Sequence, residues 1–312
     1  MQWSNYKTFE GENVMSNLDR DVHPDPIRIH KGWVLFGMLL GLFLAFLFFV
    51  ALAHAGPGMV TVTTCNQVLT GPTTYQLLAD LECDAVGIIL DSATFLLNGH
   101  TIHCNYRVLG CVVLRGSRSR IENGTIDEDY HESLVLEGEG QHRVDNLTIT
   151  PIDATVVVRS HRNRLTNVTA MSGMSPAFRI QGNGNLLVHL IATCPIVMFG
   201  GCVDVKGDTN RLEDLDVTLV DDFEPVPWGA VRVRGNKNEV RLSTLRNSQG
   251  PALIVEGTGN AVIANRLFGV VDAVDMAGCD QNRWRRNLLD TANPPCVMAQ
   301  PGPETVADLE GN

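Results

Sequence analysis

The sequence predicts an all-β fold, a parallel β-helix of about nine turns, preceded by one N-terminal transmembrane helix. Three observations predict this fold: apolar residues return about every 22 to 28 residues, they alternate as in strands, and Gly and Asn follow them in turns. One apolar position returns at Leu90, Leu114, Leu136, Val158, Ile180, Val205, Val233, Val255 and Met276. Because such a repeat is too short for a strand, a full helix and two loops, we expect each turn to consist of short strands stacked in parallel on the next turn.

Three further apolar positions accompany each repeat, one before the first position and two after it. These columns begin at Ile88, Leu97 and Ile102 and end at Val274, Trp284 and Leu289. Residues two apart on a strand point to the same side, so the columns predict one continuous core. The strand is commonly followed by Gly-x-x-Asn, as at Gly207 and Asn210, and we expect both residues to take the positive φ that a tight turn needs.

An apolar segment precedes the repeats. Residues 33–53 form an uncharged run of 21 residues, about 31 Å long as a helix, which is enough to cross a bilayer. Basic residues precede it, the last at Lys31, and none follows before Arg107, so the positive-inside rule places residues 1–32 in the cytoplasm. This predicts a single-pass membrane protein with an extracellular or luminal β-helix. A cleaved signal peptide is the alternative, because residues 53–55 read Ala-His-Ala.

Five parts are therefore expected along the chain. They are a cytoplasmic tail (1–32), a transmembrane signal anchor (33–53), a linker and N-terminal cap (56–83), the parallel β-helix (84–296) and a disordered acidic tail (297–312). Beyond residue 55 there are 20 basic and 30 acidic residues, a balance that disfavours a nucleic-acid partner.

All eight cysteines follow the membrane segment, and their even number suits an oxidising compartment. We expect disulfides rather than a metal site, with buried free thiols as the alternative. In a solenoid, neighbours in sequence are neighbours in space. The predicted pairs are Cys65–Cys83, Cys104–Cys111, Cys194–Cys202 and Cys279–Cys296.

Three asparagines, Asn123, Asn146 and Asn167, begin Asn-x-Thr sequons on the predicted outer side of the membrane. They are candidates for glycosylation. All three also occupy the same repeat position, so an inward ladder of Asn side chains bonded to the backbone of successive turns is an equal alternative.

The stretch Leu-Leu-Asn-Gly-His-Thr-Ile at residues 96–102 and the recurring Gly-x-x-Asn-x-Val turns resemble the right-handed parallel β-helix repeat proteins of the pectate-lyase-like superfamily. The resemblance covers residues 84–292. It implies a right-handed coil, and it admits polysaccharide lyases, hydrolases and epimerases as well as non-catalytic surface proteins. The polygalacturonase elements Asn-Thr-Asp, Gly-Asp-Asp and Arg-Ile-Lys do not occur in this sequence.

Charged side chains occupy the outward positions of the first strand in turns five to seven. Arg179, Asp204 and Arg232 are expected about 5 Å apart in a column, where a carboxylate between guanidiniums stays ionised and can bind a ligand. The predicted ligand-binding residues are Arg179, Asp204, Lys206, Arg232, Arg234, Asp221, Asp222 and Trp228. In an enzyme, Asp204, Arg179 and Arg232 are the catalytic candidates. The alternative is a ladder of alternating charges that stabilises an exposed sheet face.

The function expected from these observations is a membrane-anchored surface module that binds glycans or proteins without catalysis. The alternative is a membrane-bound lyase, hydrolase or epimerase acting on acidic glycans. We expect no metal site and no cofactor, except calcium if the lyase alternative holds. The expected partners are the membrane and a polysaccharide or a surface protein, but no nucleic acid.

Overall fold

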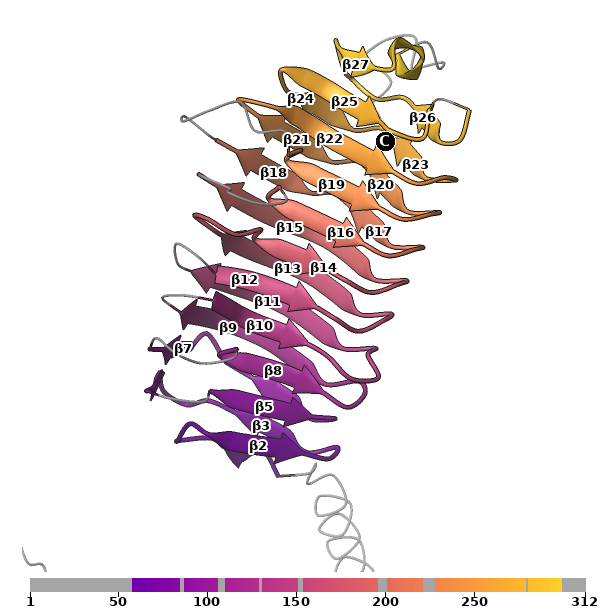
Figure 1. Cartoon of the computed structure of the whole chain (residues 1–312). Coiled ribbons are helices and arrows are strands. Elements are labelled where there is room, and N and C mark those ends of the chain that lie inside the picture. The colour runs from indigo at the N-terminus through magenta and orange to yellow at the C-terminus, as the bar shows by residue number, and fades with distance from the viewer. Residues whose placement is uncertain are drawn as a thin grey trace, which may run out of the picture. The chain divides into compact units, whose positions relative to one another are not determined.

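The computed structural model describes residues 58–298 apart from 85–86, 106–109, 129–130, 151–153, 196–200, 221–227 and 279. The described residues form a parallel β-solenoid of about nine turns, which confirms the predicted fold class (Figure 1). The predicted transmembrane segment, 33–53, lies outside them. Within the described residues there is no helix of the length and apolar character needed to cross a membrane.

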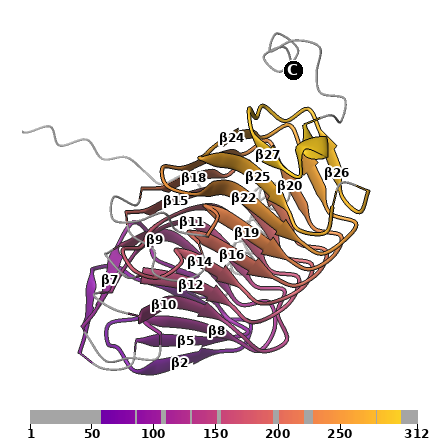
Figure 2. The same cartoon turned by 45° about the horizontal axis from the view of Figure 1, so that its top comes forward.

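One side of the coil is an 11-stranded sheet in which all paired strands are parallel. Its strands are β2 (Gln67–Thr70), β5 (Ile88–Asp91), β8 (Val112–Arg115), β10 (His131–Leu136), β12 (Ala154–Val158), β14 (Phe178–Ile180), β16 (Val203–Lys206), β19 (Val231–Arg234), β22 (Pro251–Glu256), β25 (Val271–Asp275) and β27 (Ala292–Asn293). The turned view in Figure 2 shows β14, β16 and β19 side by side in this sheet.

The other side is a 16-stranded sheet. Its continuous path runs through β1 (Val60–Thr61), β3 (Thr74–Gln76), β6 (Thr94–Leu96), β9 (Arg120–Glu128), β11 (Arg143–Thr150), β13 (Arg164–Met171), β15 (Leu186–Cys194), β17 (Arg211–Glu213), β20 (Glu239–Arg241), β23 (Ala261–Ile263) and β26 (Arg283–Arg285). Beside this path lie β4 (Leu81–Cys83), β7 (Thr101–Cys104), β18 (Asp216–Leu219), β21 (Thr244–Asn247) and β24 (Arg266–Phe268), and the 3₁₀ helix η1 (Pro295–Val297) follows β27.

The core lies between the two sheets and follows the predicted columns. Leu90 pairs in register with Leu114, and Ile121 with Val144, and all four side chains are buried. Parallel strands whose inward residues lie directly above one another bury both apolar groups and satisfy the backbone hydrogen bonds of each turn. The period of the sequence therefore encodes the stacking.

The predicted register is wrong at both ends of the repeat region. In the third column Phe95, not Leu97, pairs with Ile121, although Leu97 is also buried. In the last turn Asp275, not Met276, pairs with Val255, and Met276 is 67% exposed. The column two residues before it shifts by one residue as well: Ala273, not the predicted Val274, pairs with Leu253.

The shift in the last turn has a chemical reason. Asp275 is 3% exposed and accepts hydrogen bonds from Trp284 Nε1 (2.8 Å) and Asn282 Nδ2 (2.9 Å). A buried carboxylate is tolerated when hydrogen-bond donors surround it. A prediction based on apolar positions cannot recognise a buried carboxylate as a core residue, so it assigned the neighbouring apolar residue, Met276, to the column.

A second expectation fails in the Gly-x-x-Asn turns. Gly207 has the predicted positive φ, but Asn210 does not, and the positive value belongs to Thr209 (φ 57°). Asn210 is instead buried, where its Oδ1 accepts from the backbone N–H (2.9 Å) and Nδ2 (3.1 Å) of Asn185. Asn210 therefore satisfies polar groups of the turn before it, as buried polar groups require.

The sequon asparagines form an exposed ladder in which side chains of successive turns are hydrogen-bonded to one another. Asn146 Nδ2 donates to Asn123 Oδ1 (3.0 Å) and Asn167 Nδ2 donates to Asn146 Oδ1 (2.9 Å). All three side chains are exposed, and their φ values of 62°, 52° and 54° place them at the bends of β9, β11 and β13. The inward, backbone-bonded ladder is thus wrong, because a bend with positive φ turns these side chains outward. Glycosylation stays a prediction.

Three predicted disulfides are confirmed: Cys65–Cys83, Cys104–Cys111 and Cys194–Cys202. Cys296 is also disulfide-bonded, and its predicted partner Cys279 lies outside the described residues. The second and third bonds each bridge the end of a strand of the 16-stranded sheet and the start of the next strand of the 11-stranded sheet, so they close the loop between them.

Candidate functional site

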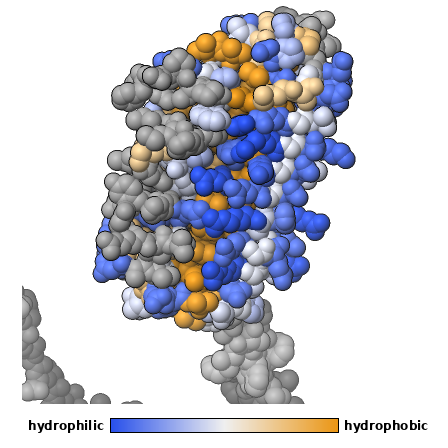
Figure 3. Space-filling view, in the orientation of Figure 1, coloured by the Kyte–Doolittle hydropathy of each residue, from blue (hydrophilic) through white to orange (hydrophobic). Residues whose placement is uncertain are grey.

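The structure brings the predicted column together on the outward side of the 11-stranded sheet. Arg179 pairs in register with Asp204, and Asp204 with Arg232. On this side of the molecule, Figure 3 shows a band of polar side chains beside an apolar strip. Alternation along β14, β16 and β19 directs the charged residues outward because Phe178, Val203 and Val231 fill the core.

Asp204 of this column and Glu256 of the neighbouring column are already paired with arginines. Arg234 Nη2 donates to both oxygens of Asp204, at 2.7 and 2.5 Å, and Asp204 is only 8% exposed. Arg232 forms its ion pair with Glu256 on β22, with Nε and Nη2 at 2.6 and 2.5 Å from Oε1. Glu256 was not among the predicted site residues. We call Asp204, Arg232, Arg234 and Glu256 the ion-paired face.

The remaining predicted residues of this face are less constrained. Trp228 lies under the Arg232 guanidinium, 5.3 Å from ring centroid to Cζ. Arg179 is half-buried and Lys206 exposed, and among the described residues neither has an ion-pair partner. Asp221 and Asp222 lie outside the described residues.

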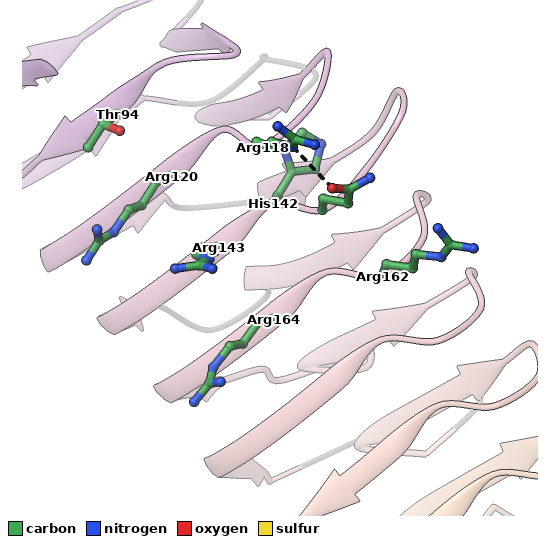
Figure 4. Close-up of a pocket in the computed structure, with 8 residues that line it drawn as sticks. Thr94, Arg118, Arg120, His142, Arg143, Arg162 and Arg164 are labelled. Carbon is green, nitrogen blue, oxygen red and sulfur yellow. Dashed lines mark hydrogen bonds between the residues drawn. The ribbon is translucent and has the colours of Figure 1, made fainter. Parts of the chain in front are cut away.

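A second polar surface lies where the 11-stranded sheet turns into β9, β11 and β13. It is a groove of about 660 Å³. Its lining residues, which define the arginine groove, are Thr94, Arg118, Arg120, Gln141, His142, Arg143, Arg162 and Arg164. Figure 4 shows Arg120, Arg143 and Arg164 on successive strands, with Arg118, His142 and Arg162 beside the adjoining turns.

Three of these arginines form a column of like charge. Arg143 pairs in register with Arg120 on one side and with Arg164 on the other. Strands in a sheet lie about 4.8 Å apart, and like charges directly opposite each other destabilise it. Arg118 and Arg162 add charge from the turns, where positive φ values of 61° and 56° hold them beside the column.

Little negative charge balances these five guanidiniums. Arg120 forms an ion pair with Glu122 of its own strand, whereas Arg118 and Arg164 donate to neutral oxygens, Gln141 Oε1 (3.2 Å) and Thr166 Oγ1 (3.1 Å). Among the described residues, the guanidiniums of Arg118, Arg143, Arg162 and Arg164 have no carboxylate within 4.0 Å. The groove therefore has an excess of positive charge, although the protein as a whole has a net charge of −11.

The histidine of the groove is neutral. His142 is buried and continues the asparagine ladder: its Nδ1 accepts from Ser119 N (3.2 Å), so the proton resides on Nε2, which donates to Glu137 O (2.8 Å). Burial lowers the pKa of His142 below its ordinary value of 6.5, although the bond to the Glu137 carbonyl opposes this. The arginines thus supply the charge of the groove.

A shallower hollow of about 370 Å³ continues along the same edge of the coil. It shares Gln141 and Arg162 with the arginine groove, and its other lining residues are Glu139, His161, Asn183, Gly184 and Thr209. The two hollows therefore form a continuous depression along successive turns, charged at one end and mostly neutral at the other.

The sequence analysis missed the arginine groove. The signal was present: in three successive turns an arginine stands directly before the third apolar column, at Arg120, Arg143 and Arg164. The charge repeat predicted from the sequence lies at the outward positions of the first strand, whereas this column lies in the other sheet. Among the described residues no group of three or more His, Cys, Asp or Glu side chains is arranged to hold a metal ion.

No protein-family model matches this chain, and a search of curated proteins finds no match. The resemblance to the pectate-lyase-like superfamily therefore stays a prediction, while the parallel β-solenoid itself is shown by the structure.

Proposed function

We propose that this protein is a non-catalytic surface module that binds an anionic polysaccharide in the arginine groove. The observation that carries the proposal is the in-register column of Arg120, Arg143 and Arg164. A bound polyanion would relieve the repulsion between these stacked guanidiniums and form charge-assisted hydrogen bonds with them. The glycan-binding function expected from the sequence is thereby moved from the first-strand face to this groove.

The lining residues favour an acidic polysaccharide over other polymers. A neutral sugar needs an aromatic platform, and a single strand of nucleic acid needs aromatic side chains on which bases stack. The groove has no Trp, Tyr or Phe among its described lining residues. The local excess of arginine attracts polyanions, and without aromatic side chains to stack on bases it suits an anionic glycan better than a single strand of nucleic acid.

The ion-paired face supports a binding role rather than catalysis. A general acid or base needs a carboxyl group that is open to exchange its proton with substrate. Asp204 and Glu256 are instead held by Arg234 and Arg232, and Asp204 is buried beneath its partner. In this proposal these pairs stabilise the sheet and are not a reaction centre.

The proposal includes the location predicted from the sequence. Residues 33–53 anchor the chain in the membrane with residues 1–32 in the cytoplasm, and the solenoid faces the extracellular or luminal side. The disulfides support an oxidising compartment. We also propose that the solenoid is right-handed and related to the pectate-lyase-like superfamily, on the residues that carry the resemblance.

The test is a binding measurement on the full chain in detergent micelles, with heparin, polygalacturonate and neutral dextran as probes. We expect binding of the anionic polymers, weakening with salt, and none of dextran. Arg143→Ala combined with Arg164→Ala should abolish most of the binding. Arg283→Ala is the matched control, because Arg283 is exposed, continues the same column and has no ion pair among the described residues.

Two results would overturn this function. Unchanged polyanion binding by a folded Arg143→Ala, Arg164→Ala variant would remove the groove as the site. Release of unsaturated uronate or new reducing ends by the wild type, lost in Asp204→Ala, would establish the enzyme alternative.

A further inference from the structure

The charges of the arginine groove alternate from turn to turn. One row, Arg120, Arg143 and Arg164, has a guanidinium in every turn. A second row, in the adjoining turns, consists of Arg118, Gln141 and Arg162. These residues are equivalent because the backbone N–H of each donates to the corresponding carbonyl of the following turn: Gly140, His161 and Asn183 respectively. Successive turns therefore present two, one and two guanidiniums.

The acidic neighbours of the groove fix the direction of a bound polyanion. Two residues further along β9 and β11 stand Glu122 and Asp145, which pair in register with each other. A polyanion running along the strands would meet these carboxylates, whereas one running across the strands, parallel to the coil axis, meets arginines in three successive turns and then the mostly neutral hollow. The chain of the ligand therefore runs parallel to the coil axis.

We propose that the arginine groove selects an anionic polysaccharide with a two-sugar repeat, in which sugars richer and poorer in anionic groups alternate. This inference rests on the proposed function. The alternating row repeats every second turn, about 9.6 Å, which matches two extended sugar units. Gln141 is the specificity-determining residue. Its side-chain carbonyl already accepts a hydrogen bond from Arg118 Nε (3.2 Å), so its uncharged NH₂ group is left to donate to a hydroxyl group of the sugar.

The basic tract also has defined ends. In the column of Arg120, the neighbouring turns contribute Thr94 on one side and Leu186 on the other. In the row of Arg162, the next turn contributes Gly184. The sugar next beyond the tract meets no guanidinium in these rows, and the guanidinium one turn further on, Arg211, is already paired with Glu213. Affinity should therefore rise with ligand length over about three units and then level off.

The experiment compares size-matched oligosaccharides on the full chain in detergent micelles by calorimetry. One set is heparin-type, with an alternating two-sugar repeat; the other is dextran sulfate, with sulfate spread uniformly along one kind of sugar. We expect the wild type to bind the alternating oligosaccharide about fivefold more tightly, which is the range of one exposed ion pair. The variant Gln141→Arg should tighten dextran sulfate by a similar factor and leave the heparin-type ligand nearly unchanged.

Gln181→Arg is the matched control, because it adds the same charge at an exposed glutamine outside the groove. If Gln141→Arg and Gln181→Arg act alike, or if the wild type binds both oligosaccharides equally at equal charge, the selectivity is refuted while binding at the groove stands. Absence of binding by either ligand would instead refute the proposed function, and the selectivity with it.

Discussion

The same two outward columns of the 16-stranded sheet are built in opposite ways in two regions of the molecule. In β9, β11 and β13 the first column is Arg120, Arg143 and Arg164. Two turns further on, β17 and β20 place Arg211 and Glu239 in that column and Glu213 and Arg241 in the next. We call these last four residues the neutralised cluster.

Within the neutralised cluster each charge has opposite neighbours. Arg211 Nη2 lies 2.9 Å from Glu213 Oε2, and Arg241 Nη1 lies 3.8 Å from Glu239 Oε1. Arg241 also pairs with Glu213 across the strands. The hydrogen bond from Arg241 lowers the pKa of Glu213 and raises that of Arg241, so both stay charged.

The difference shows that the fold does not require the arginine column. A checkerboard of Arg and Glu fits the same backbone positions and satisfies itself, whereas the arginine column leaves like charges aligned. In the proposed function this uncompensated charge serves a ligand, and it lowers the stability of the unliganded protein.

The largest effect is expected from converting the groove to the pattern of the neutralised cluster. Arg143→Glu places a carboxylate between Arg120 and Arg164, so it should weaken heparin binding more than tenfold, because one attraction is lost and one repulsion is added. The same change should raise the free energy of unfolding by about 0.5–1 kcal/mol. Calorimetric binding and urea denaturation check the two parts. If the variant loses both binding and stability, the arginine column does not cost stability relative to the pattern of the neutralised cluster.

A second effect concerns the side chain beneath each region. The buried ladder contains His142 below the arginine groove and Asn238 at the corresponding position below the neutralised cluster. His142→Ala strips Ser119 N and Glu137 O of their partner and should cost about 1–3 kcal/mol in urea denaturation. His142→Asn restores the ladder residue of the other turns and should recover most of this loss.

The same histidine predicts acid sensitivity. Because burial lowers the pKa of His142 in the folded protein, the unfolded chain binds a proton more readily. Stability is therefore lost as pH falls below the ordinary pKa of 6.5 toward the folded pKa. His142→Asn should remove this part of the pH dependence in denaturation curves recorded between about pH 7 and 5. An identical slope in the variant would show that His142 is not responsible.

The sequence predicted the stacking and the charged first-strand column, because period and alternation determine which residues meet. It did not predict which arginine binds Asp204, since Arg232 and Arg234 are both within reach and only the packed side chains favour Arg234. It also missed Asp275, a buried carboxylate in an apolar column. The arginine groove was not predicted because it joins strand and turn residues of three successive turns, although an arginine repeats in each of these turns.

The third effect tests the structural role of the neutralised cluster. Arg241→Ala leaves Glu213 and Glu239 without one partner and should cost about 1 kcal/mol, at the upper end for ion pairs near the surface. Heparin binding should not change, because Arg241 does not line the groove. Arg143→Ala is the matched variant and should show the reverse: weaker binding with little change in stability. Loss of binding in Arg241→Ala would mean that the anionic ligand covers both regions.

The smallest effect is the acid response of the neutralised cluster. The pKa of Glu213 is lowered in the folded protein, chiefly by its hydrogen bond from Arg241, so its stabilisation is present above the ordinary pKa of 4.5 and is lost as pH falls through the folded pKa. Glu213→Gln removes this titration, and the variant should lose less stability than the wild type between about pH 5 and 3, by a few tenths of a kcal/mol. Among the described residues no carboxylate is paired with Arg143 or Arg164, so Arg143→Gln should leave the acid response of the unliganded protein as it is. An altered response would show that Asp145, which follows Arg143 on β11, already compensates it in solution, and the excess of positive charge that separates the two regions would then be smaller than the contacts indicate.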